Sequence, residues 1–192
     1  MIDDFAKENL HGSLRWARKV AVLKLDGLSE YDVRRPLSVT GTNLLGLVKH
    51  LAHGEARYFG EVFDRPFPEP MARWDDPAAA DTLWVPEHET RAEILGLHQR
   101  AGEHADATID ALALDAPGHV LWWPEPEVKL FRVMSHVLYE YNRHLGHLDI
   151  LREQLDGATG SDFDGGALSG KDAAFWAERC AKIERAAKIA SS

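Results

Sequence analysis

Apolar residues recur at three- and four-residue intervals along four long stretches of this 192-residue chain. That interval is the period of an α-helix that buries one face, and no run of consequence alternates with the period of a strand. The stretches cover residues 3–26, Thr42 or Asn43 to about Asp64, Pro86 or Thr90 to about Leu114, and about Val128 to Asp156. The pattern therefore predicts an all-α protein.

The connections between these stretches indicate how the helices are arranged. Residues 28–36 form a polar connection, whereas residues 65–86 contain five prolines and exclude a regular helix of useful length. About twenty residues is long for a link between adjacent antiparallel helices, and is typical of a connection that crosses a bundle. We therefore expect a four-helix bundle with a long crossover connection.

A change of composition after Gly157 predicts a second part of the chain. Residues 158–170 are rich in glycine and serine, as in a linker, and residues 171–189 follow as a last amphipathic helix. That helix packs either on the bundle or on a partner. The expected organisation is a bundle over residues 1–157, followed by a linker and C-terminal helix over residues 158–192.

Charge and cysteine content exclude several classes of function. The net charge is -9, and no basic stripe is present to bind a nucleic-acid backbone. The single cysteine, Cys180, excludes an internal disulfide framework and a cysteine-based zinc site. No apolar run reaches the roughly 20 residues of a membrane span, and the N-terminus has no signal-peptide core. We expect a cytoplasmic protein without nucleic-acid or membrane partners.

Candidate chemistry is concentrated in the fourth helix, in MSHVLYEYNRHLGHLDILRE. His136, Glu140, His144 and His147 lie at offsets of 0, 4, 8 and 11, which places them within about 80° on a helix. The residues between them are largely apolar, so this stripe faces other helices. Two interpretations stay open: the stripe binds a metal ion, or Glu140 and His144 form a hydrogen-bonded polar pair inside the bundle.

The second helix offers the missing ligand in His50 or His53. His50 borders the apolar face of its helix, where a lone histidine is more often a hydrogen-bonded core residue. Two imidazoles and one carboxylate suit zinc, and also nickel or ferrous iron, and leave positions open for water or substrate. His98 and His104, on the third helix, are expected at the surface or behind the ligands.

Two segments of the chain resemble the DinB-like superfamily: TGTNLLGLVKHLAHGEARYF and LFRVMSHVLYEYNRHLGHLDILREQLDG. The similarity is greatest to the actinobacterial branch related to the metal-binding domain of mycothiol-dependent maleylpyruvate isomerase, and it covers roughly residues 5–157. It implies a four-helix bundle that holds a divalent metal on His50, Glu140 and His144. The histidines expected beside the ligands are His53, His136 and His147.

The resemblance also implies a function. Several relatives use mycothiol or bacillithiol as cosubstrate and act as thiol S-transferases or isomerases, and relatives often form homodimers. A divalent ion on two neutral imidazoles and one carboxylate keeps a net positive charge and can bind a thiol as thiolate. The expected partners are therefore a small-molecule thiol and an electrophile. The alternatives are a metal-binding protein without catalysis, with a stress-related or regulatory role, and a metal-dependent hydrolase.

Aromatic residues in the connections are candidates for the wall of a substrate pocket. Trp74 and Trp84 either cover its mouth or simply pack the long loop, and Trp122 lies in the segment before the fourth helix. Tyr139, His147 and Arg143 are candidates for orienting a substrate, although helix geometry places Arg143 away from the stripe.

Overall fold

The computed structural model describes residues 2–71, 76, 82–159 and 170–191. The chain divides into two compact units, Met1–Gly157 and Ala158–Ser192.

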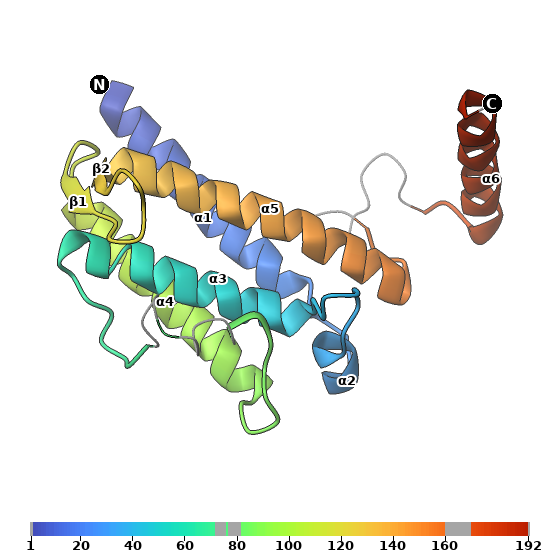
Figure 1. The fold of residues 1–192 in the computed structure, drawn as a ribbon, viewed down its shortest axis with the longest axis horizontal. Coiled ribbons are helices and arrows are strands. Elements are labelled where there is room, and N and C mark those ends of the chain that lie inside the picture. Colours follow the sequence, from blue (N-terminus) through green and yellow to red (C-terminus); the bar gives the residue numbers. More distant parts are fainter. Residues whose placement is uncertain (1, 72–75, 77–81, 160–169, 192) are drawn as a thin grey trace. The chain divides into compact units, whose positions relative to one another are not determined.

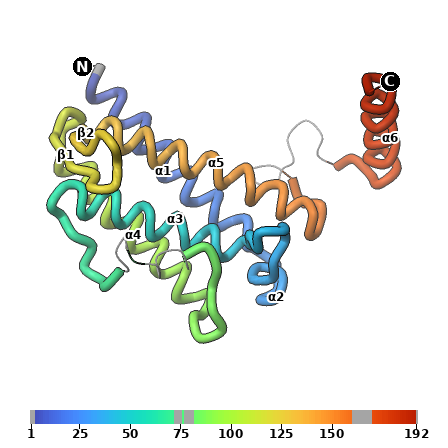
Figure 2. The backbone as a smooth tube through the Cα atoms, in the orientation of Figure 1, coloured from blue at the N-terminus to red at the C-terminus, as the bar shows by residue number. Residues whose placement is uncertain are grey.

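Four long helices make up the first unit (Figure 1): α1 (Ile2–Leu23), α3 (Leu44–Tyr58), α4 (Arg91–Ala111) and α5 (Leu130–Asp156). Helix α3 packs against α4 and α5, and α1 packs against α5 and α4. Helices α3 and α4 run in the same direction, so the connection between them returns along the bundle (Figure 2). The predicted all-α bundle with a crossover is confirmed.

The helix ends differ from the prediction, and the structure adds a short helix, a 3-10 turn and a small sheet. The connection after α1 contains a short helix, α2 (Glu30–Arg34), which is too short for a periodic pattern. Helix α3 ends at Tyr58 and is followed by a 3-10 turn, η1 (Glu61–Phe63). A two-stranded antiparallel sheet, β1 (Pro117–His119) and β2 (Glu127–Lys129), precedes α5. Strands of three residues are too short to show an alternating pattern in the sequence, and this small sheet leaves the fold all-α.

The apolar faces of the four long helices meet in one core. On α3 the predicted apolar residues are buried except for Tyr58, which is partly buried and packs against the core. Helix α3 begins at Asn43, whose side chain accepts a hydrogen bond of 2.8 Å from the backbone N–H of Gly46. A Cβ atom at Gly46 would lie 2.1 Å from the carbonyl oxygen of Leu83, so the segment before α4 crosses α3 in direct contact.

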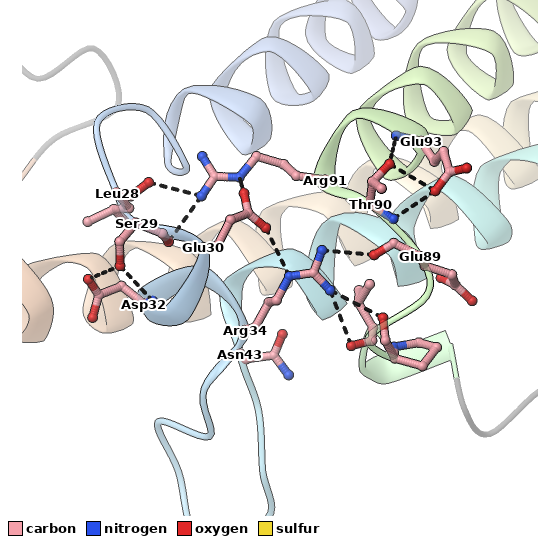
Figure 3. A network of polar contacts seen from close by, with 12 residues as sticks. Leu28, Ser29, Glu30, Asp32, Arg34, Asn43, Glu89, Thr90, Arg91 and Glu93 are labelled. Atoms are coloured by element: carbon pink, nitrogen blue, oxygen red, sulfur yellow. Dashed lines mark hydrogen bonds and ion pairs between the residues drawn. The ribbon is translucent and has the colours of Figure 1, made fainter.

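Polar contacts hold the segment before α4 in place (Figure 3). Arg34 of α2 donates hydrogen bonds to the carbonyls of Val85, Pro86 and Glu89. Arg91 donates to the carbonyls of Leu28 and Ser29 and pairs with Glu30 at 2.7 Å. Arg34 therefore links α2 to the backbone of the segment before α4.

The second unit contains α6 (Ala173–Ala190). The side chain of Asp172 caps it by accepting a hydrogen bond of 2.8 Å from the backbone N–H of Phe175. None of its residues is buried, and Cys180 is exposed. Across the described residues of both units, every helix is too short or too polar to cross a membrane.

Candidate metal centre

Three ligand-type side chains from two helices meet inside the bundle. One ligand atom each of His50 on α3 and of Glu140 and His144 on α5 lie within 4.8 Å of one another. The rings of His50 and His144 stand edge to face with their centroids 5.0 Å apart. Among the described residues this is the one such group of three or more.

The local geometry of α5 aligns two of these side chains. Glu140 and His144 are four residues apart, so they share one face of the helix. Glu140 Oε2 lies 3.6 Å from His144 Nε2, and the His144 side chain is only 12% exposed. His50 reaches them because α3 packs directly on α5.

The electrostatics keep both imidazoles neutral. Burial, together with the neighbouring His50, His147 and Arg143, lowers the pKa of His144 to about 4. The pKa of His50 is also lowered, mainly by burial, against the opposing charge of Glu140. A neutral imidazole has the free lone pair that a metal ligand requires.

The donor set fits a divalent ion. Ligand atoms about 2.1 Å from a tetrahedral ion stand roughly 3.4 Å apart. The distance of 3.6 Å between Glu140 Oε2 and His144 Nε2 is close to this, and all three ligand atoms lie within 4.8 Å of one another. His144 Nδ1 lies 3.3 Å from His147 Nδ1, so a neighbour holds one ring nitrogen while the other faces Glu140. Metal-binding histidines are commonly oriented in this way.

The three expected neighbours lie around the centre in different environments. His136 packs edge to face on Tyr58 and Trp123, with centroid distances of 4.9 Å and 4.7 Å. His53 is partly buried, and burial lowers its pKa to about 4. His147 is exposed and contacts His144. None of these three belongs to the group of converging ligand atoms among the described residues.

A cavity of about 450 Å³ opens beside the converging side chains. Its wall combines His50 and Glu140 with apolar, aromatic and polar side chains from α3, α5 and the connections. A largely apolar cavity of this size with a few convergent polar groups is typical of a small-molecule site. The other lining residues are Leu51, His53, Gly54, Glu55, Arg57, Tyr58, Thr82, Trp122, His136, Val137 and Tyr141.

The aromatic candidates for the pocket wall fall in different places. Trp122 lines the cavity, and its indole N–H donates a hydrogen bond of 3.3 Å to Tyr58 Oη. Tyr139 is 60% exposed and is absent from the lining, because its position on α5 turns it to solvent. Trp84 lines a separate, more open groove. Trp74 lies outside the described residues.

Sequence reasoning missed several residues of the cavity wall. Tyr141 and Glu55 are buried, and the Tyr141 hydroxyl donates to Glu55 Oε2 at 2.9 Å. The same hydroxyl oxygen lies 3.1 Å from His98 Nε2. His98 is therefore a core residue, 3% exposed, and not a surface residue as one of the expectations had it. The sequence does contain a signal for the burial of Glu55. This residue lies seven positions after Val48 and four after Leu51, which places it within the apolar face of its helix.

Of three comparisons with known proteins, one relates the chain to a family. A family model described as mycothiol S-transferase matches residues 9–157. Comparisons with curated proteins and with solved structures gave no match. The family match covers well over half of the chain and includes all three converging side chains. The chain therefore belongs to the mycothiol S-transferase family, a DinB-like family related to mycothiol-dependent enzymes.

Proposed function

We propose that this protein is a divalent-metal-dependent thiol S-transferase that uses mycothiol. Its metal ligands are His50, Glu140 and His144. The observation that carries the proposal is the convergence of these three side chains within 4.8 Å beside a cavity of about 450 Å³. Membership of the mycothiol S-transferase family supports the thiol as cosubstrate.

The protein groups have separate roles in this proposal. Two neutral imidazoles supply lone pairs without charge, and Glu140 supplies one negative charge. A bound divalent ion keeps a net charge of about +1 and so lowers the pKa of a coordinating thiol. Zinc suits this donor set best, and nickel or ferrous iron fit it as well.

The cavity wall holds the reactants. Tyr58, Trp122 and His136 form its aromatic part, and Leu51 and Val137 its aliphatic part. Arg57 also lines the cavity, with its guanidinium 5.8 Å from the centre of the Trp122 ring. We infer that this wall binds the electrophile next to the thiol and keeps bulk water from it.

The cavity favours catalysis over the rival role as a metal-binding protein without catalysis. A purely structural metal site is usually closed by four protein ligands, whereas a catalytic site keeps a position open. Three ligand-type residues converge here among the described residues, and two of them line the cavity. This arrangement supports the S-transferase.

Metal analysis tests the ligand set. We expect protein purified without chelators to carry close to one zinc or other divalent ion per chain. His50→Ala and Glu140→Ala should each lose most of it, because one ligand of three is removed. His136→Gln, which changes a cavity residue outside the ligand group, is the matched control and should keep its metal. Full occupancy in both ligand variants would overturn the assignment.

Turnover tests the reaction. Metal-loaded protein should consume mycothiol in the presence of a panel of electrophiles, with the thiol followed by a colorimetric reagent. A chelator should abolish the reaction and zinc should restore it. A protein that binds metal through these ligands but turns over no electrophile would support the non-catalytic alternative.

A further inference from the structure

A buried polar network lies directly next to the proposed metal ligands. Its centre is the hydrogen bond of 2.9 Å from Tyr141 Oη to Glu55 Oε2. Because the one hydroxyl proton is donated to this carboxylate, the 3.1 Å contact with His98 has Nε2–H as the donor. Tyr141 follows Glu140 on α5, and Glu55 lies five residues after His50 on α3.

Helix α1 completes the network. Arg18 binds Glu55 Oε1 through Nε at 2.8 Å and Nη2 at 2.7 Å. Its remaining nitrogen, Nη1, binds Asp106 Oδ1 on α4 at 2.6 Å. The network thus joins all four long helices of the bundle.

Stability alone is a weak explanation for such a network. Removing two charges from water offsets most of their attraction, so apolar residues often replace a buried ion pair at no loss of stability. The best-attested role of buried polar groups is to fix the register of packed helices. Apolar contacts tolerate a small slip between helices, whereas a hydrogen bond of 2.9 Å does not.

The network and the metal ligands use the same two helices. Helices α3 and α5 are antiparallel (Figure 1), so a residue further along α3 lies opposite a residue earlier in α5. From His50 to Glu55 the chain advances five residues on α3, and from His144 to Tyr141 it goes back three residues on α5. The two contacts therefore lie about two turns apart or less along the same helix pair.

We propose that Tyr141 and Glu55 are positioning residues of the metal centre. The hydrogen bond between them holds α5 against α3 in the register in which His50 meets Glu140 and His144. This inference rests on the proposed metal site, since it concerns how those ligands are aligned. Ligands of a working site must be held within roughly 0.5 Å, which is finer than apolar packing alone provides.

The test compares zinc affinity with stability. Tyr141→Phe keeps the ring and its packing and removes only the hydroxyl. We expect its zinc dissociation constant, measured by competition with a chromophoric chelator, to rise at least about tenfold, as when the supporting shell of a metal site is disturbed. The absorption spectrum of the Co²⁺-loaded variant, which reports ligand geometry, should differ from that of the wild type.

Thr108→Val is the matched control. Thr108 is fully buried on α4 and accepts a partly buried hydrogen bond of 3.1 Å from Arg65 Nε, so the variant also loses one side-chain hydrogen bond. This bond does not join α3 to α5. Thr108→Val should lower the melting temperature of the metal-free protein to a similar degree, but it should leave zinc affinity within about twofold and the Co²⁺ spectrum unchanged.

The outcomes separate the two proposals. If Tyr141→Phe binds zinc as tightly as Thr108→Val and gives the wild-type Co²⁺ spectrum, the network serves stability only and the positioning role is wrong. If the wild type binds zinc no better than His50→Ala, the metal site itself is wrong. Should Tyr141→Phe fail to fold by circular dichroism, Glu55→Gln, which keeps the shape of the side chain, is judged by the same two measurements.

Discussion

Three histidines that lie wholly or partly inside the bundle have lowered pKa values. Burial lowers the pKa of His53, His98 and His144 to about 4 in each case. For His98 the cause is burial first and the charge of Arg18 second. A neutral His98 can donate to Tyr141 without placing a second positive charge beside Arg18.

This pKa predicts acid sensitivity of the fold. Because the pKa of His98 is about 4 when folded and 6.5 when free, the unfolded state binds more protons between these values. The contribution of His98 to the free energy of unfolding is therefore fully present above about pH 6.5 and is lost as the pH falls toward 4. We expect about 2 kcal/mol of this loss between pH 7 and pH 5.

Urea unfolding of the wild type and of His98→Gln at the two pH values measures this loss. Glutamine keeps an N–H donor for Tyr141 but does not titrate, so the variant should lose about 2 kcal/mol less than the wild type on acidification. An equal loss in both proteins would mean that His98 is not the group that titrates. The metal-free protein must be used, so that release of metal from His50 and His144 does not contribute.

At the scale of elements, α3 combines several tasks within fifteen residues. Asn43 caps its first turn, and Gly46 in that turn lies in close contact with the backbone of Leu83. His50 lies in the middle of the helix. Lys49, next to His50, pairs with Glu89 at 2.7 Å and so ties the segment before α4 to the helix. The helix thus positions both a proposed ligand and a boundary of the site.

Gly46→Ala tests the close approach at Leu83. A methyl group there would overlap the backbone of Leu83, and we expect a loss of about 1–3 kcal/mol in the free energy of unfolding. Gly54→Ala on the same helix is the control, because a Cβ atom there meets nothing within 4 Å. It should be neutral or stabilising by up to about 1 kcal/mol, since alanine favours helix over glycine. Chemical denaturation of both variants measures the difference, and equal stability would contradict the contact.

At the scale of the whole bundle, the proposed metal would link the two halves of the chain. His50 lies in the first half of the unit Met1–Gly157, and Glu140 and His144 lie near its end. An ion held by all three binds only the folded arrangement, so metal binding and folding are coupled.

Zinc should therefore raise the melting temperature. At free zinc of about 100 times the dissociation constant, the folded state gains roughly 2.7 kcal/mol. Differential scanning fluorimetry with zinc or with a chelator measures the shift. The same zinc concentration should change the melting temperature of His144→Ala far less, and an equal shift in both proteins would point to zinc binding elsewhere.

The sequence by itself determined the secondary structure and part of the site. The helical period depends on local backbone geometry, so the four long helices and the proline-rich crossover could be predicted. The spacing of four between Glu140 and His144 places them on one face of any helix. Helix α2 and the strands β1 and β2 are too short to show a helical or alternating period, so the sequence did not predict them.

Only the tertiary structure decided which residues meet across helices. His50 and His53 lie about 60° apart on α3, and the rotation of α3 against α5 brings His50, and not His53, into the ligand group. The same rotation placed Glu55 and Tyr141 in the core beside His98 and left Tyr139 in solvent. Periodicity gives the face of each helix, but the angle and register at which two faces meet depend on the packing of the whole core.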